Sequence, residues 1–251
     1  MEPKSRALLI DIKRCIGCRA CVAACKQAHA FPGDDTATEL SATAYTALVD
    51  KSEDIHVRKL CMHCLTPSCA SVCPVGALQK TAAGPVEYDA VRCLGCRYCM
   101  VACPWSVPRY EWSALAPSVR KCDFCRERFA QGELPACVEA CPVEATVAGT
   151  REDLVREAHR RVAEDPKGYD PQIYGETEAG GTSVLFLSPV PFAELGFRQG
   201  LGSEPLPGLT WEMLDKIPGV VTIGGTTLYA LWWITHRREE VARAEEAARA
   251  R

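Results

Sequence analysis

The sequence predicts an α+β fold, in which two interleaved, duplicated cysteine-rich units are followed by one C-terminal transmembrane helix. Three observations lead to this prediction. All sixteen cysteines fall into four groups of four. The first and third groups form an internal repeat, because residues 15–25 (CIGCRACVAAC) align with residues 93–103 (CLGCRYCMVAC). An uncharged stretch at 217–235 follows well after the last cysteine.

The cysteines are close together within each group, and their spacing is chemically informative. Three groups end in Cys-Pro, whereas the first ends in Cys25-Lys26. The run Cys-x2-Cys-x2-Cys-x3-Cys is the ligand spacing of bacterial ferredoxins with two [4Fe–4S] clusters, where the fourth cysteine ligates the other cluster. The spacing therefore predicts four clusters and an electron-transfer role. The groups are Cys15, Cys18, Cys21, Cys25; Cys61, Cys64, Cys69, Cys73; Cys93, Cys96, Cys99, Cys103; and Cys122, Cys125, Cys137, Cys141.

Two other uses of cysteine compete with this interpretation. Structural zinc sites typically take two separated pairs that close on four local ligands, and disulfide frameworks seldom contain such close triplets. A zinc-stapled structural protein is the alternative of another class, and a soluble polyferredoxin without a membrane anchor is a third hypothesis. Iron and zinc analysis separates the first two, and fractionation without detergent tests the third.

Exchange of the fourth cysteine requires the groups to be paired. The first and third groups are compact, whereas the second and fourth contain a longer gap. A two-fold arrangement should join one compact group with one gapped group. First with fourth and third with second satisfies this condition, but so does first with second, and spacing alone leaves both open.

Short strands and helices are expected around the cysteines. Period-two and helical spacings of apolar residues indicate where they lie. The expected strands are 7–11, 85–89 and 182–187; the expected helices are 20–27, at its start, and 151–163; and the expected irregular segments are an insertion at 30–54 and a loop at 165–181.

The uncharged stretch 217–235 predicts a transmembrane helix. At about 1.5 Å rise per residue it nearly crosses a hydrocarbon core of about 30 Å. Trp232 and Trp233 lie near one end, as interfacial aromatic residues do. The small residues 224–227 offer a face for packing on another membrane helix, so we expect helical partners in the bilayer.

The charges around this stretch predict its orientation. Basic residues favour the cytoplasm, and the tail is much more basic than the preceding flank, which has only Lys216. We expect a cytoplasmic tail that continues as a helix through the pairs Glu239–Arg243 and Glu245–Arg249. The apolar stretch 7–10 is too short for a secretory signal and no twin-arginine pair precedes it, so we expect no export signal of its own.

Other polar residues are expected to have supporting roles. Arg19, Arg97 and Lys26 are candidates for tuning nearby clusters by their charge. His63 is not expected to be a ligand, and His236 is expected at the membrane interface. The net charge of −3 gives no sign of nucleic-acid binding, and no catalytic triad, paired carboxylates or phosphate loop is evident.

From residue 15 to about 196 the sequence resembles the four-cluster electron-transfer (β) subunits of the molybdopterin oxidoreductase family. The formate dehydrogenase-N β subunit and the membrane-anchored ferredoxin subunit of the hydrogenase-2 type are the nearest likenesses. The matching stretches are CMHC…CASVCPVGAL, CLGCRYCMVACPW, RKCDFCRERFAQGELPACVEACP, GTREDLVREAHRRV and GGTSVLFL.

This resemblance implies four [4Fe–4S] clusters with exchanged ligands. The first-group cluster is expected nearest the catalytic subunit and the third-group cluster nearest the membrane. Some relatives replace the second cysteine of the third group, but Cys96 is present here, so [4Fe–4S] is expected at every site. The implied ligand sets are Cys15, Cys18, Cys21 and Cys141; Cys122, Cys125, Cys137 and Cys25; Cys61, Cys64, Cys69 and Cys103; and Cys93, Cys96, Cys99 and Cys73.

The resemblance also implies partners and a location. Electrons are expected to pass between a catalytic subunit and a membrane cytochrome b or quinone-reactive subunit. The first choice of catalytic subunit is a molybdopterin formate dehydrogenase, and the alternative is a NiFe hydrogenase or another quinone-linked enzyme. We expect export with a signal-bearing partner and a single-pass inner-membrane protein whose cluster domain faces the periplasm. The expected domains are 1–203 (halves 1–54 with 118–203, and 55–117), a linker at 204–216, the transmembrane helix at 217–236 and a basic helical tail at 237–251.

Overall fold

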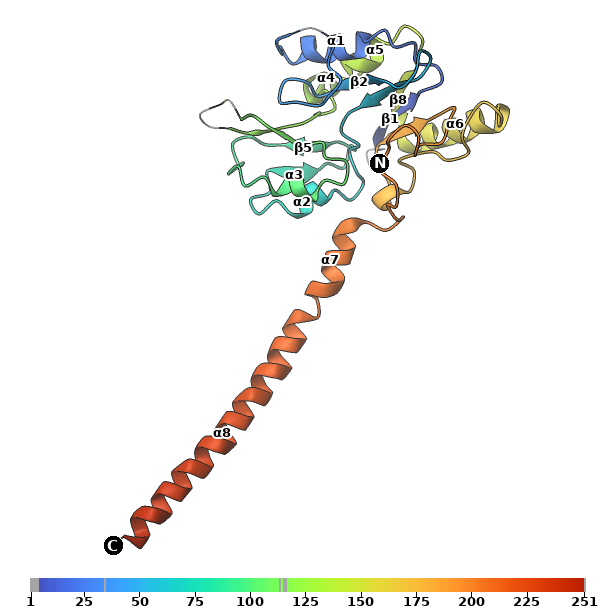
Figure 1. Ribbon diagram of the computed structural model, residues 1–251. Helices are drawn as coiled ribbons and strands as arrows, with labels where there is room; N and C mark the ends of the chain where they lie inside the picture. The colour runs from blue at the N-terminus through green and yellow to red at the C-terminus, as the bar shows by residue number, and fades with distance from the viewer. Residues whose placement is uncertain (1–4, 34, 113, 115–116, 251) are drawn as a thin grey trace. The chain divides into compact units, whose positions relative to one another are not determined.

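The computed structural model describes residues 5–33, 35–112, 114 and 117–250. They divide into two compact units, Met1–Pro207 and Gly208–Arg251 (Figure 1). The first unit holds every cysteine, and the second consists of helix.

A three-stranded sheet organises the first unit. Its central strand is β1 (Arg6–Asp11), which pairs antiparallel with β8 (Thr146–Thr150) and parallel with β9 (Val184–Leu187). The sheet therefore ties the start of the chain to segments that follow the last cysteine. The predicted strands at 7–11 and 182–187 are confirmed, the second beginning at Val184.

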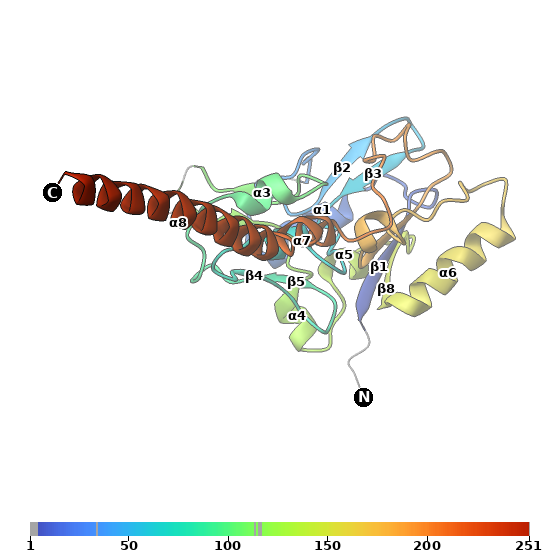
Figure 2. The same ribbon diagram turned by 90° about the horizontal axis from the view of Figure 1, so that it is seen from below.

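Both faces of this sheet are covered, because its strands are apolar on both sides. Ala7 and Leu9 pack with Leu154 and Ala158 of helix α6 (Arg151–Glu164), which lies along one face (Figure 2). The alternate residues of β1 and β9 belong to a second core on the other face: Leu8, Ile10, Val184 and Phe186, packed with Ile12, Val57, Leu60, Met62, Phe124, Tyr174, Phe192 and Leu195.

Helix α6 is fixed at its start and near its end. The Thr150 hydroxyl oxygen accepts a hydrogen bond from the Asp153 N–H at 3.2 Å, which caps the helix. Near the end, Arg161 donates to the fully buried carboxylate of Asp11 at 3.0 Å, and the Tyr169 hydroxyl donates to the same carboxylate at 2.9 Å. The helix predicted at 151–163 is confirmed.

Short elements surround the cysteines. Three antiparallel hairpins are present in the described residues, and each joins neighbouring strands. They are β2 (Ala47–Asp50) with β3 (His56–Lys59), β4 (Leu78–Lys80) with β5 (Val86–Tyr88), and β6 (Arg109–Tyr110) with β7 (Val119–Arg120). The helices are α1 (Ala20–Ala28), α2 (Ser68–Ser71), α3 (Tyr98–Ala102), α4 (Arg126–Ala130) and α5 (Ala136–Glu139).

The two copies of the repeat end differently, and the residue after the fourth cysteine explains why. Helix α3 ends at Ala102, directly before Cys103-Pro104. The residue before a proline is driven out of the helical region, and Cys103 is extended with ψ 115°. In the first copy Lys26 replaces the proline, and α1 continues to Ala28.

Three segments expected to be irregular contain regular structure. The insertion at 30–54 includes β2, which forms a hairpin with β3. The loop at 165–181 includes a 3-10 turn at Glu178–Gly180. The linker at 204–216 holds helix α7 (Leu206–Leu214). Periodicity missed them because each is short or lacks a one-sided apolar face.

The second unit is dominated by helix α8 (Ile217–Arg249), which extends the predicted span into the basic tail. Among the described residues, one helical segment, Leu206–Arg249, is long and apolar enough to cross a membrane. Its apolar side chains are exposed within this unit, as at Ile223. Threonine hydroxyls donate to carbonyls one turn back, as Thr226 does to Thr222 at 2.7 Å, which suits a lipid environment. His236, exposed, stacks on Trp232.

Replacing Asp11 should destabilise the first unit strongly. Asp11→Ala removes the fully buried carboxylate and leaves Arg161 with Glu157, at 2.7 Å, as its carboxylate partner, so the cost should lie near the lower end of the range for breaking a buried ion pair, about 3 kcal/mol. Tyr169→Phe removes one neutral donor and should cost about 1 kcal/mol. The measurement is the midpoint of thermal unfolding by circular dichroism; equal midpoints for the two variants would contradict the role given to Asp11.

Candidate metal centre

The packing of the short helices brings the cysteine groups together in pairs. Helix α1, from the first group, lies against α5, from the fourth. Helix α2, from the second group, lies against α3, from the third (Figure 1). The structure thus associates the first group with the fourth and the second with the third, rather than the first with the second.

Within these pairs the thiols form four sets, each drawing three cysteines from one group and one from its partner. One set lines a cavity with apolar walls, and another lines a second small cavity. The other two sets consist of mutually interacting thiols. The sets are Cys15, Cys18, Cys21 and Cys141; Cys122, Cys125, Cys137 and Cys25; Cys61, Cys64, Cys69 and Cys103; and Cys93, Cys96, Cys99 and Cys73.

The four sets are linked in succession, because a cysteine of each set lies close enough to a cysteine of the next for their charges to interact. Cys21 of the first set interacts with Cys137 of the set around the fourth group. Cys122 of that set interacts with Cys61 of the next. Cys69 in turn interacts with Cys99 of the last set. Each set therefore has a neighbour in the order first, fourth, second and third group.

The repeat preserves the backbone of the loops that carry the first three cysteines. Gly17 and Gly95 have φ of 69° and 73°, and Arg19 and Arg97 have φ of 59° and 64°. These left-handed conformations favour glycine. A Cβ on Gly17 would also lie 2.5 Å from the ring of His56, so this loop is closed by the β2–β3 hairpin.

A turn after the Cys-Pro cysteines directs N–H groups at their sulfurs. Gly76 and Ser106, three residues after Cys73 and Cys103, have positive φ. The next residues donate: the Ala77 N–H to Cys73 Sγ at 3.2 Å and the Val107 N–H to Cys103 Sγ at 3.5 Å. At Cys73 burial opposes ionisation, but the surrounding N–H groups outweigh it and lower the thiol pKa.

Elsewhere burial dominates the thiols. It raises the pKa of Cys69 and of Cys125 to about 12, and that of Cys99 to about 11, with neighbouring cysteines adding to the shift. Such thiols stay protonated at neutral pH, and metal binding must release their protons. Soft sulfur donors in this number, converging in four sets of four, fit iron–sulfur clusters.

Buried cations accompany the thiols, and the sequence analysis missed them. Arg58 is 4 % exposed and interacts with the sulfurs of Cys137, Cys21 and Cys25. Burial alone would lower its pKa, but these sulfurs more than offset that and raise it. Lys121 is 5 % exposed, and its ammonium donates to the carbonyl of Cys122 at 2.9 Å. Buried cations require compensating negative charge, which a thiolate-bound cluster supplies.

Two of the cations proposed from sequence also lie beside thiols: Arg19 borders the cavity of the first-group set, and Arg97 borders that of the third-group set. Arg19 forms an ion pair with Asp50 at 2.6 Å, and the Arg97 guanidinium lies 5.3 Å from the centre of the Trp112 ring. Arg58 was overlooked because it lies on the β2–β3 hairpin, outside every cysteine loop. For a cation on a strand outside the cysteine motifs, no local sequence pattern shows which thiols it will contact.

His63 packs in the interior in an unusual conformation. It is fully buried with φ 48°, and its Nδ1 accepts the Val86 N–H at 3.0 Å. Its ring stands edge-on to Phe124, 4.9 Å away, at the matching position of the fourth group. Burial lowers the pKa of His63, and the charges of Lys121 and Lys80 lower it further, so the ring is neutral.

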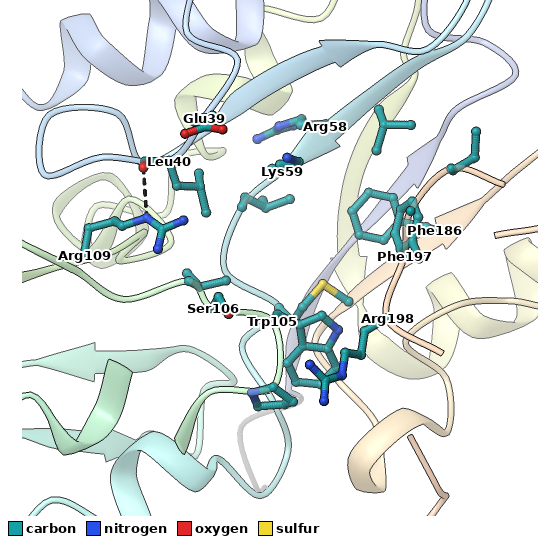
Figure 3. A pocket seen from close by; sticks show the side chains of 17 residues that line it. Glu39, Leu40, Arg58, Lys59, Trp105, Ser106, Arg109, Phe186, Phe197 and Arg198 are labelled. Carbon is teal, nitrogen blue, oxygen red and sulfur yellow. Dashed lines mark hydrogen bonds between the residues drawn. The ribbon is translucent and has the colours of Figure 1, made fainter. Parts of the chain in front are cut away.

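A cavity of about 380 Å³ opens beside the cysteines, between β3, the loop after Cys103 and the segment 195–198 (Figure 3). Trp105, Phe186 and Phe197 form apolar walls, and its lining includes no cysteine. Arg58 borders both this cavity and the one lined by the first thiol set, so it stands in the wall between them.

The geometry also bears on zinc. Across the described residues, no three His, Cys, Asp or Glu side chains converge as ligands of a single metal ion do. Ligands of a four-iron cluster stand farther apart, since each binds a different iron. A cluster bound by one thiolate on each iron does not require its four sulfurs to converge on one point.

Comparisons with known proteins agree with this geometry. Two family profiles, both described as a 4Fe–4S dicluster domain, match residues 53–151 and 14–77. A protein of Nitratidesulfovibrio vulgaris is 41 % identical over 97 % of this chain and 70 % of its own length. The hydrogenase-2 operon protein HybA of Escherichia coli O157:H7 is 38 % identical, covering 77 % of this chain and 73 % of its own.

A further relative carries a different name. The formate dehydrogenase iron–sulfur subunit of Haemophilus influenzae is 33 % identical, covering 88 % of this chain and 77 % of its own. Each of these relatives aligns with more than two thirds of this chain. The chain belongs to the family of iron–sulfur electron-transfer subunits that includes HybA and the iron–sulfur subunits of formate dehydrogenases.

Proposed function

We propose that this chain relays electrons, one at a time, through four [4Fe–4S] clusters in a membrane-bound respiratory complex. The observation that carries the proposal is the succession of four thiol sets, in which neighbouring sets interact through Cys21 and Cys137, Cys122 and Cys61, and Cys69 and Cys99. A succession of cofactors connects two ends, and a relay needs a donor at one end and an acceptor at the other.

Each cluster takes three ligands from one cysteine group and one from the partner group. Cys141 completes the first-group cluster and Cys25 the fourth-group cluster, while Cys103 and Cys73 complete the second and third. The packing of α1 on α5 and of α2 on α3 supports this exchange. It also supports two dicluster halves, residues 1–54 with 118–203 and residues 55–117, in a domain that ends near residue 203, with 204–216 as the connection to the membrane helix.

The catalytic partner is, in our first proposal, a molybdopterin formate dehydrogenase subunit. The relative from H. influenzae, named as a formate dehydrogenase iron–sulfur subunit, supports it over 88 % of this chain. A NiFe hydrogenase is the second candidate, supported by the 38 % identity to a hydrogenase-2 operon protein. The chain itself supplies the relay and leaves substrate chemistry to the partner.

The acceptor is a membrane cytochrome b or quinone-reactive subunit that meets the third-group cluster. Large apolar side chains are exposed around that cluster: Val91 is 96 % exposed and Val101 is 89 % exposed. Leu94, Tyr98 and Trp112 extend this surface, which we call the third-group patch. Exposed apolar patches of this kind mark protein or membrane contacts.

The complex lies in the inner membrane, with α8 as a single-pass anchor. The basic tail favours the cytoplasm, which assigns the cluster unit to the periplasmic face. Folded cluster domains then require export together with a signal-bearing partner. Protease added to intact spheroplasts should cleave the cluster unit and spare the tail; the reverse pattern would overturn this orientation.

Metal analysis and ligand replacement test the cluster assignment. The purified full-length chain should contain about sixteen irons and absorb broadly in the visible range, as four Cys-ligated [4Fe–4S] clusters require. With exchanged ligands, Cys141→Ser should perturb the same electron paramagnetic resonance signal as Cys18→Ser. Cys25→Ser should perturb the signal that Cys125→Ser perturbs.

Two outcomes of the same measurements would contradict the cluster assignment. If Cys25→Ser changes the Cys18 signal instead, each group binds its own cluster and the exchange is wrong. About four zinc ions per chain and no visible absorbance would replace the relay with a zinc-stapled structural role.

The catalytic partner is tested by the metals of the solubilised complex. Affinity purification through the N-terminal unit should yield a large subunit with molybdenum or tungsten and pterin, together with formate-dependent reduction of the clusters. Nickel with hydrogen-dependent reduction would establish the second candidate and exclude the first.

The third-group patch should be needed for electron transfer to the membrane partner. Val101→Glu adds a charge to an exposed apolar contact, so quinone reduction should fall about tenfold or more. Reduction of a soluble dye by the catalytic subunit should stay unchanged. Leu134→Glu, which introduces the same charge at an exposed apolar residue outside the third-group patch, is the control.

A chain truncated after Pro207 distinguishes contact with the membrane partner from attachment to the bilayer through α8. The truncated chain should lose membrane attachment in high salt, whereas Val101→Glu should keep it. Unchanged quinone reduction in Val101→Glu would remove the patch from the interface.

A further inference from the structure

Arg58 stands at the junction of two thiol sets. Its guanidinium interacts with Cys21 of the first-group set and with Cys137 and Cys25 of the fourth-group set. It also borders the cavity lined by Cys15, Cys18, Cys21 and Cys141. Since these two sets are neighbours through Cys21 and Cys137, a single cation lies between both proposed clusters.

The protein holds this cation rigidly. Arg58 Nε donates to the Thr46 hydroxyl at 2.9 Å, and its Nη1 donates to the Thr146 hydroxyl at 3.1 Å. These bonds connect strand β3 to the start of β2 and to β8. Arg58 is 4 % exposed, so solvent cannot screen its charge effectively.

The usual compensation for a buried arginine is a carboxylate, and here sulfur takes its place. Within the described part of the chain, no Asp or Glu forms an ion pair with Arg58, although Arg19, Arg120 and Arg161 each have such a pair. Both hydroxyl partners are neutral. The guanidinium cannot lose its proton in a protein, so its charge is permanent.

We propose that Arg58 sets the reduction potentials of the first-group and fourth-group clusters together, raising both. The inference rests on the proposed cluster function. Reduction adds one negative charge to a thiolate-bound cluster, and a nearby fixed cation favours the more negative state. Because Arg58 contacts both sets, it shifts the two potentials in the same direction.

The test is a redox titration of the full-length, cluster-loaded chain in detergent, followed by electron paramagnetic resonance. Arg58→Gln should lower the equilibrium constant for one-electron reduction at least tenfold at each of the two clusters. That change is about 59 mV more negative for a one-electron couple. The second-group and third-group clusters should keep their potentials, which makes them internal controls.

Matched variants separate charge from structure. Thr146→Val removes an acceptor of Arg58 but keeps the cation, and Arg58→Lys keeps a cation without the planar fork. Both should stay within a threefold change in that equilibrium constant at all four clusters. Where Arg58→Gln fails to load clusters, Arg58→Lys decides: a tenfold or larger loss with the charge retained overturns the proposal.

Two further outcomes distinguish failure of the Arg58 inference from failure of the proposed function. Unchanged potentials in a fully loaded Arg58→Gln chain would make Arg58 a structural staple only, while the relay function stands. A wild-type chain that binds zinc rather than iron would instead remove the proposed function itself, and that result comes from the metal analysis.

Discussion

The meeting of cysteines from distant segments is the constraint on which the N-terminal unit depends. Cys25, inside helix α1, lies among thiols of the fourth group, and Cys141 lies among those of the first. Between the second and third groups the buried cluster consists of Cys69 and Cys99 with only three other fully buried side chains. A domain built this way has little apolar material of its own at these points, so metal binding and folding are coupled.

The coupling of metal binding to folding explains why cationic side chains are buried in this unit. Arg58 and Lys121 are buried beside thiols, where an apolar core would make both unfavourable. The thiols themselves are costly to ionise, as the raised pKa of Cys125, about 12, shows. Anionic clusters bound by thiolates supply negative charge to the buried cations. The cations in turn stabilise the negative charge of the clusters and their thiolates. The same charges then act on the potentials of the clusters.

The sequence allowed much of the fold and the site to be predicted, for identifiable reasons. Strands β1 and β9 and helix α6 have clear apolar periods, and the cysteine spacing marks the loops directly. The pairing of groups depends on tertiary packing of helices as short as four residues, α2 and α5, which spacing cannot order. Strand β2 was missed because it has only four residues. Arg58 was missed because its position depends on a contact with Thr146, far away in the sequence.

The small difference between the repeats has a large structural effect. In the second copy Pro104 ends the helix, and the following turn directs the Val107 N–H at Cys103. In the first copy Lys26 lets α1 continue to its C-cap residue, His29, which contacts Asp123 at 2.9 Å beside the fourth group. Burial opposes the charge on His29, but the Asp123 hydrogen bond and its charge raise the pKa to about 10.

Side-chain cations and backbone N–H groups both act on the thiols, and cations act in both halves, since the charge of Lys121 opposes the effect of burial on the pKa of Cys69 in the second group. Around the first and fourth groups, side-chain cations such as Arg58 and His29 approach the thiols. At Cys73 and Cys103, the adjustment comes from backbone N–H groups fixed by the Cys-Pro turn. A backbone donor survives every substitution except proline, whereas a side-chain cation can be replaced by one mutation. The backbone contribution is therefore fixed by the fold, whereas the contributions of cations such as Arg58 and Lys121 can be changed at single positions.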